Sequence, residues 1–166
     1  LTVGKKKYAN VQEDILALKA RTDKLQAEFL TLVERDAAVF EPLSRAYGLP
    51  KDTPEQQAEK TRVMEAALKE ACAVPLQIME KCAEAIELHR EFAAKGTALA
   101  ISDVGVGVVF CKAAMQGASL NVFINTKYMQ DRDYAETANR RANELLGKYL
   151  PLADAIYADV AARFFE

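Results

Sequence analysis

Glycine and proline are scarce in this sequence, with only 7 Gly and 5 Pro among 166 residues. Few positions are therefore available for turns, so the elements between them must be long, which favours helices. A chain of 166 residues corresponds to one domain, since a single core ordinarily serves about 100 to 200 residues. Hydrophobic residues make up 51% and charged residues 28%, the balance of a folded globular chain. We expect one helical domain over residues 1–166.

Histidine and cysteine are too few for several kinds of site. His89 is the only histidine, which excludes a multi-histidine metal site. The three cysteines are an odd number without CxxC spacing, so neither a disulfide framework nor a structural zinc site is expected. No GxGxxG, Walker loop, GxSxG or ExxH pair supports dinucleotide binding, NTP hydrolysis, serine hydrolysis or a di-iron bundle. We expect no metal and no prosthetic group.

The sequence also lacks an excess of positive charge. A formal net charge of −2 and a pI near 5.6 argue against a nucleic-acid or anionic-membrane partner. No apolar run reaches about 18 residues and no signal segment opens the chain, so neither membrane spanning nor secretion is predicted. We expect a cytoplasmic protein. Because Leu1 rather than Met comes first, we also expect the sequence to be a fragment or a processed chain.

Apolar residues recur at spacings of three and four, which is typical of one face of a helix. Thr53, Pro54 and Gln56 supply an N-cap, a first-turn proline and a capping-box glutamine for the second helix. The expected helices cover residues 11–47, 53–95, 102–125 and 131 onward. The predicted fold class is therefore all-α, an elongated up-and-down bundle of about four long helices.

The third predicted helix is apolar almost all the way round, which places it inside the fold or at a subunit interface. Ser102 or Asp103 is expected to cap its start. Pro75 and Pro151 lie inside the second and fourth helices and predict bends there. Small residues allow neighbouring backbones to approach the third helix closely: Gly105, Gly107, Ala113, Ala114, Gly117 and Ala118.

Two aspartates are candidates for proton transfer. Asp36 follows Leu32 by four residues and so stands where the apolar stripe would place a leucine. Burial favours the protonated form of a carboxyl group and prepares it to act as a general acid or base near neutral pH. The structural alternative for Asp36 is an ion pair with Arg35, Arg45 or another helix. The alternative for Asp103 is the plain capping role.

Asn121 and Asn125 are four residues apart and share a face of the apolar third helix. A buried asparagine offers donors and acceptors to a heterocyclic ligand, and a hydrogen bond between helices is the structural alternative. Eighteen residues, or about 27 Å of helix, separate Asp103 from Asn121. The two can share one active site only if helices from two subunits cross; otherwise they belong to different sites.

The only concentrated positive charge is the triplet Lys5, Lys6 and Lys7 near the first helix. It is a candidate for binding phosphate or carboxylate groups, although such a run is commonly a solvated face. His89 falls near the apolar stripe of the second helix, where a structural histidine is more common than a catalytic one.

Five segments, in order and in register over nearly the whole chain, resemble the formiminotransferase-cyclodeaminase and methenyltetrahydrofolate cyclohydrolase family. They are Leu1-Thr2-Val3-Gly4-Lys5-Lys6-Lys7-Tyr8, Leu49-Pro50-Lys51-Asp52-Thr53-Pro54, Val74-Pro75-Leu76, Ile101-Ser102-Asp103-Val104-Gly105-Val106 and Asn121-Val122-Phe123-Ile124-Asn125. The family begins with a Pro-Gly-Gly-Gly segment and a helix ahead of the Gly-Lys-Lys stretch. Neither is in this sequence, so we expect one helix and part of the folate site to be missing from it.

The resemblance implies an all-helical, homodimeric enzyme with a one-carbon tetrahydrofolate derivative as its substrate and no metal. Its reaction would be closure of 5-formiminotetrahydrofolate to 5,10-methenyltetrahydrofolate with loss of ammonia, which we slightly prefer, or interconversion of the methenyl and 10-formyl forms. Asp36 or Asp103 would transfer the proton. Asn121 and Asn125 would bind the pterin or the one-carbon unit. Lys5, Lys6 and Lys7 would hold the carboxylates of the folate tail, including a polyglutamate tail.

A third interpretation comes from another class of protein. In a non-catalytic helical interaction module, the misplaced Asp and Asn side chains would only fix the register of the helices through buried hydrogen bonds. Folate binding distinguishes this module from the two enzymes.

Overall fold

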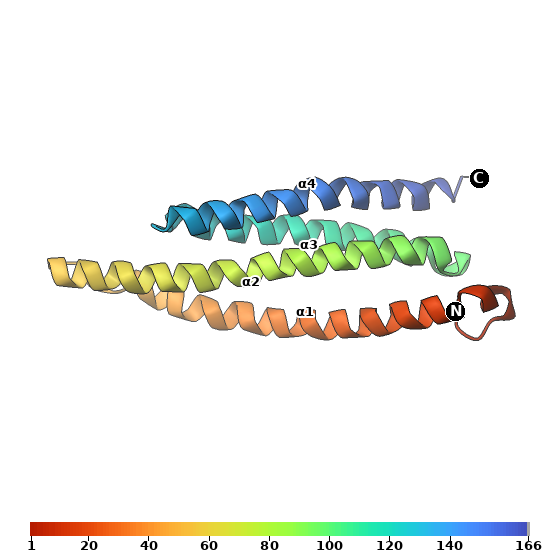
Figure 1. The fold of residues 1–166 in the computed structure, drawn as a ribbon, viewed down its shortest axis with the longest axis horizontal. Helices are drawn as coiled ribbons and strands as arrows, with labels where there is room; N and C mark the ends of the chain where they lie inside the picture. Colours follow the sequence, from red (N-terminus) through yellow and green to blue (C-terminus); the bar gives the residue numbers. More distant parts are fainter. Residues whose placement is uncertain (166) are drawn as a thin grey trace.

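The computed structural model describes residues 1–165, and these contain helices and no strand. The four long helices are α1 (Gln12–Tyr47), α2 (Pro54–Lys95), α3 (Ile101–Tyr128) and α4 (Arg132–Ala162). Two short 3-10 turns, η1 (Lys6–Val11) and η2 (Ala98–Ala100), precede α1 and α3. The helices lie side by side in an elongated stack in the order α1, α2, α3, α4 (Figure 1). The predicted all-α bundle of four long helices is confirmed.

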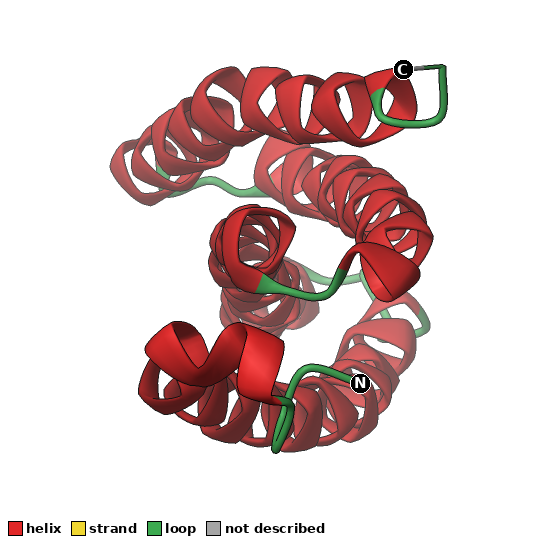
Figure 2. Ribbon diagram, turned by 90° about the vertical axis from the view of Figure 1, so that its right-hand side faces the viewer, coloured by secondary structure: helices red, strands yellow, loops and turns green. Residues whose placement is uncertain are grey.

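The stack is open, because α1 and α4 lie on opposite sides of the molecule with α2 and α3 between them (Figure 2). Helix α2 is central and packs against each of the other three long helices. Its fully buried residues Leu68, Met79 and Ile86 belong to the main core, together with Val108 and Met115 of α3. Helix α1 joins this core at Leu43 and forms a smaller cluster with α2 near its own start. One face of α1 and one face of α3 are therefore left without a partner in this chain.

The start of α2 follows the sequence prediction. The Thr53 hydroxyl accepts a hydrogen bond from the Gln56 backbone N–H at 3.3 Å, and the Gln56 side-chain oxygen accepts one from the Thr53 N–H at 3.3 Å. Pro54 occupies the first turn, where no donor is needed. This reciprocal pair satisfies two N–H groups that a helix start otherwise leaves free.

The predicted cap of α3 was wrong. The helix begins at Ile101, its N-cap position is Ala100 without a side-chain hydrogen bond, and Asp103 lies inside the first turn. Thr97 instead caps the preceding turn η2 by accepting a hydrogen bond from the Leu99 N–H at 3.4 Å. Because η2 already has helical geometry, the polypeptide enters α3 without a separate polar cap.

Within this chain, helix α3 is covered on some faces and exposed on another, so the expectation that it lies inside the fold holds only in part, and its alternative of a subunit interface stays a prediction. Val106, Phe110, Leu120 and Ile124 have exposed fractions between 48 and 70%. By length and composition alone, Ala98–Tyr128 is apolar enough to cross a membrane. Asp103 and Lys112 interrupt this segment, so it contains no unbroken apolar run of the length that a membrane span needs. Such a helix buries only part of its apolar surface within its own chain.

Candidate functional site

The lysine triplet lies in a segment that hydrogen bonds fix onto the turn between α2 and α3. The Thr97 N–H donates to the Thr2 hydroxyl at 3.0 Å, and the Tyr8 hydroxyl donates to Thr97 Oγ1 at 3.2 Å. The Gln12 amide closes the segment on itself by donating to the carbonyls of Thr2 and Tyr8 at 3.1 and 3.0 Å. Gly4 has φ +75°, a left-handed conformation that glycine adopts without strain. The lysines are therefore exposed on an ordered segment at one end of the bundle.

A cavity of about 240 Å³ lies beneath this segment, and Asp103 is on its exposed rim. The hydrogen bond with Thr97 and the charge of Lys7 lower the pKa of Tyr8. The Lys7 Nζ lies 5.6 Å from the centre of the Tyr8 ring, which brings at least one lysine close to Thr97. The cavity is lined by Thr2, His89, Phe92, Gly96, Thr97, Ala100, Asp103 and Val104. This end of the bundle thus combines a carboxylate, hydroxyl groups and exposed ammonium groups.

His89 borders this cavity and a second one. Its Nδ1 lies 2.7 Å from the carbonyl oxygen of Ala85, so Nδ1 carries the proton and Nε2 does not face that carbonyl. The imidazole packs against Gly107 so closely that a Cβ added there would lie 2.1 Å from Nε2. The second cavity, of about 380 Å³, is mostly apolar and lies between α1 and α2, with Leu25 and Phe29 among its lining residues. The hydrogen bond to the Ala85 carbonyl is typical of a structural histidine. The same imidazole also lines both cavities.

Asp36 is partly buried and forms no ion pair or hydrogen bond with any other described residue. The partners expected from sequence are engaged elsewhere, since Arg35 donates to the Gln77 side chain at 2.9 Å and Arg45 pairs with Glu41. The carboxylate of Asp36 is thus available to a ligand or to another chain.

Asn125 and Asp36 lie at a similar level of the bundle on either side of α2. The Asn125 amide donates to the carbonyl of Ala71 at 2.9 Å, whereas Arg35, next to Asp36, contacts Gln77. Ala71 and Gln77 are six residues apart, which is about 9 Å along a helix. Asn121 is one turn from Asn125 and is exposed. The hydrogen bond between helices, which was the structural alternative for these asparagines, is observed for Asn125.

The candidate residues consequently form two groups in one chain. Helix α3 is continuous from Asp103 to Asn121, so the distance of about 27 Å along its axis holds. The first group contains Asp103 and the lysine triplet, and the second contains Asn121 and Asn125, with Asp36 on the other side of α2. Within one protomer the structure does not bring the two groups together.

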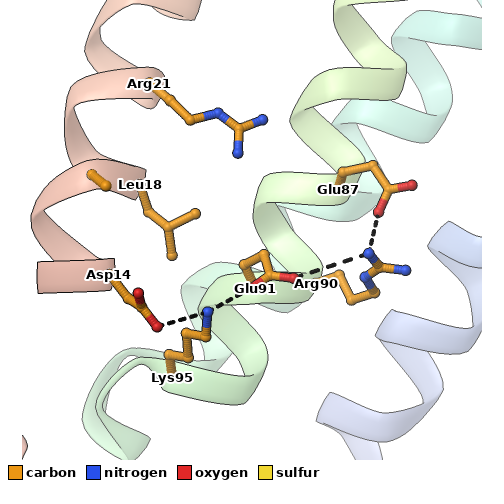
Figure 3. Close-up of a pocket in the computed structure, with 8 residues that line it drawn as sticks. Asp14, Leu18, Arg21, Glu87, Arg90, Glu91 and Lys95 are labelled. Atoms are coloured by element: carbon orange, nitrogen blue, oxygen red, sulfur yellow. Dashed lines mark ion pairs between the residues drawn. The ribbon is translucent and has the colours of Figure 1, made fainter. Parts of the chain in front are cut away.

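A third, strongly charged cavity of about 380 Å³ lies between α1 and α2 (Figure 3). Lys95 contacts both Asp14 and Glu91 at 2.9 Å, and these hydrogen bonds, Glu91 first, raise the pKa of Lys95. Arg90 pairs with Glu87 at 2.8 Å. With Arg21, the lining holds three acidic and three basic side chains, so it offers no net charge to an ionic ligand. We regard this cavity as an ion-pair network that fixes α1 against α2.

Sequence reasoning missed Thr2, Tyr8 and Thr97 as parts of the first group. Their roles depend on hydrogen bonds between residues 89 and 95 positions apart in the chain. The spacing of apolar residues indicates only which residues of one helix are neighbours. It therefore gives no sign that Thr2 and Tyr8 contact Thr97. The Gly96-Thr97 turn was the one available cue, because it ends a long helix next to the predicted site.

Comparison with known proteins gives consistent similarities. A family model described as formiminotransferase-cyclodeaminase matches residues 1–144. The methenyltetrahydrofolate cyclohydrolase of Methylorubrum extorquens is 36% identical over 163 residues, which cover 98% of this chain and 78% of that protein. The formimidoyltransferase-cyclodeaminase of Rattus norvegicus is 28% identical over 163 residues, covering 98% of this chain and 30% of that protein.

A solved structure shares the fold. The crystal structure of formiminotetrahydrofolate cyclodeaminase from Thermotoga maritima superposes with a TM-score of 0.75 at 24% identity, covering 96% of this chain and 73% of that chain. The long helices and their order are therefore common to both proteins.

Proposed function

The chain belongs to the formiminotransferase-cyclodeaminase family, and from this premise we propose that it is a one-carbon tetrahydrofolate enzyme that hydrolyses 5,10-methenyltetrahydrofolate to 10-formyltetrahydrofolate. The observation that carries the choice of reaction is the 36% identity to the cyclohydrolase over 78% of that protein's length. The sequence alone led to a slight preference for the deaminase, and on this identity we now place the hydrolase first. Closure of 5-formiminotetrahydrofolate with loss of ammonia is the second candidate, which the similarity to the rat enzyme favours.

The hydrolysis needs a negative charge and a proton acceptor near the one-carbon unit. The methenyl group is part of a cationic N–C–N system. Water adds to its carbon and loses one proton to a base; the remaining hydroxyl proton then leaves the oxygen as the C=O bond forms, the bond to N5 breaks and N5 takes up a proton, so that one proton is released overall. A carboxylate close to the carbon stabilises the cation and accepts the proton from water. Asp36 has a carboxylate that no described residue engages, and it is partly buried, so it fits this role. Asn121 and Asn125 would orient the pterin.

The lysines fit the other end of the substrate. The folate tail ends in glutamate carboxylates, and Lys5, Lys6 and Lys7 are exposed on an ordered segment. Ammonium groups attract carboxylates over distances of roughly 10 Å at physiological salt. We assign the triplet to the tail and Asp103, on the adjoining rim, to proton transfer or to a tail-side contact.

We further propose that the enzyme is a homodimer with composite active sites. The exposed apolar face of α3 supports this proposal, because apolar patches of this extent mark interfaces. Two chains that cross along α3 in opposite directions would bring Asp103 of one protomer toward Asn121 and Asp36 of its partner. The separation of about 27 Å within one protomer would then be bridged by the second copy.

The test is turnover by the full-length protein of both folates. Methenyltetrahydrofolate absorbance is followed in one sample, and methenyl formation from 5-formiminotetrahydrofolate with ammonia release in another. We expect accelerated loss of the methenyl signal without formimino turnover. Asp36→Asn and Asp103→Asn should each lower kcat by about 10²- to 10⁴-fold, the usual contribution of a general acid or base.

The matched control is Glu34→Gln, which removes an exposed carboxylate two residues from Asp36. It should retain the activity of the unmodified protein. If both aspartate variants fold and keep full turnover, the assignment of proton transfer is wrong. If the protein neither turns over nor binds a folate, the interaction module is the better interpretation.

A further inference from the structure

Pro75 lies in the interior of α2 and is completely buried. Proline has no backbone N–H, so it cannot donate to the carbonyl four residues before it, which belongs to Ala71. The helix nevertheless continues from Pro54 to Lys95 without interruption. A buried carbonyl that loses its donor must find another one, because an unsatisfied buried polar group is costly.

Asn125 of α3 supplies that donor. Its Nδ2 lies 2.9 Å from the carbonyl oxygen of Ala71, the one carbonyl of α2 that Pro75 releases. Because a carbonyl oxygen only accepts hydrogen bonds, the amide must turn its NH₂ group toward Ala71, which fixes the orientation of the whole planar group. The Oδ1 of Asn125 accepts no hydrogen bond from any residue among 1–165, and the side chain is only partly buried.

We infer that Pro75 is a positioning residue: it fixes the Asn125 amide so that Oδ1 is presented as an acceptor to an N–H donor of a bound heterocycle. This inference rests on the proposed folate activity, and a reduced pterin ring carries several such N–H groups. The exposed Asn121, one turn away on the same helix, places a further polar group beside Asn125.

A stability cycle tests the contact between Asn125 and the Ala71 carbonyl. Asn125→Asp has almost the same shape but cannot donate to Ala71, so it should lower the thermal midpoint Tm by about 5 °C. Pro75→Ala restores a backbone N–H to the Ala71 carbonyl. In that background, Asn125→Asp should lower Tm by less than half as much. Equal losses in both backgrounds would show that Pro75 and Asn125 are not coupled, and would overturn the inference.

Folate binding tests the positioning role. The probe is 5-formyltetrahydrofolate, a stable folate, titrated calorimetrically into the full-length protein. We expect Pro75→Ala to weaken binding by about tenfold, the scale of one hydrogen bond, because the freed amide samples other orientations. Pro151→Ala is the matched control, since it also removes a proline from a helix interior but lies exposed in α4. It should leave binding unchanged.

The outcomes separate this inference from the proposed reaction. Coupled stabilities with weakened binding in Pro75→Ala support the inference, even if the protein hydrolyses neither folate. Coupled stabilities with unchanged binding overturn the positioning role. Failure of the unmodified protein to bind the folate overturns the ligand assignment of Asn125 and, with it, the proposed activity.

Discussion

Asp131 combines two interactions in one carboxylate at the start of α4. It accepts a hydrogen bond from the Tyr134 backbone N–H at 3.0 Å as the N-cap, and it contacts the Lys69 ammonium of α2 at 2.6 Å. The hydrogen bond from Lys69, followed by that from Tyr134, lowers the pKa of Asp131. The same pairing raises the pKa of Lys69. A single side chain thus fixes the end of α4 against the central helix.

The lowered pKa of Asp131 predicts how its substitutions depend on pH. The stabilisation from a carboxylate of lowered pKa is present above the unfolded value, near 3.8, and is lost as pH falls through the still lower folded value. Asp131→Asn keeps a good cap but removes the charge, so it should lower Tm by about 2 °C at pH 7 and by less at pH 2. Thermal melts between these pH values provide the measurement.

Asp131→Ala is the control for the prediction at Asp131, because it also removes the cap. Its loss of stability should remain at both pH values, since alanine cannot accept a hydrogen bond at any pH. A loss in Asp131→Asn that does not change with pH would show that the Lys69 contact contributes no stability.

The sequence identified some site residues and not others for a physical reason. Asp36 and Asn125 stand out because a polar side chain breaks an apolar stripe, which is a local signal. The sequence could not show that Arg35 pairs with Gln77, or that Asn125 serves the carbonyl freed by Pro75. Those facts depend on the relative register of neighbouring helices, which repeats of three and four residues do not encode.

Helix α3 is the element where sequence reasoning was least complete. The sequence shows that apolar residues occur on all sides of this helix. It does not show which of these sides are covered by the other helices of the same chain. The start of α2 was predicted correctly because Thr53, Pro54 and Gln56 form a cap within four residues. The start of α3 was not, because its entry depends on Thr97 and on the 3-10 turn that follows.

Gly107 gives a prediction for the packing of α3 against α2. A Cβ at this position would lie 2.1 Å from Nε2 of His89, whose Nδ1 is held by the Ala85 carbonyl. Gly107→Ala should therefore lower the free energy of unfolding by about 1 kcal/mol or more, despite the better helix propensity of alanine. Urea unfolding of the variant measures this loss.

Gly147→Ala in α4 is the matched control, because a Cβ there would have no neighbour within 4 Å. It should raise the free energy of unfolding by about 0.5 to 1 kcal/mol. Combining Gly107→Ala with His89→Ala should recover part of the loss. Equal effects at the two glycines would contradict the close packing of His89 on Gly107.

The whole molecule leaves a continuous apolar stripe uncovered. Every residue of this stripe is on α3, and the spacing alternates mostly between four and three, as in a helix-pairing seam. Its members are Val106, Phe110, Ala113, Gly117, Leu120, Ile124 and Tyr128. Helix α1 also exposes apolar side chains, among them Leu30, Val33 and Phe40. A second copy of the chain is the occupant that would also unite the two groups of candidate residues.

Disruption of the stripe tests the proposed dimer. Leu120→Glu places a charge in the middle of the seam, so it should convert a dimer to a monomer in sedimentation equilibrium and abolish turnover. Tyr157→Glu is the control, because it adds the same charge at an exposed residue of α4 and should leave the dimer intact. A monomeric unmodified protein that instead binds phosphatidylcholine vesicles would assign the apolar face to a membrane.

Mixing of two inactive variants tests whether the sites are composite. If each site takes Asp36 from one protomer and Asp103 from its partner, a heterodimer of Asp36→Asn and Asp103→Asn contains one intact site and one site with both substitutions. Random reassortment makes half of the dimers heterodimers, so the mixture should regain about a quarter of the unmodified activity. Sites confined to single protomers would regain none, because each protomer lacks one aspartate. The recovery therefore measures directly whether the distance of about 27 Å along α3 is bridged by the second chain.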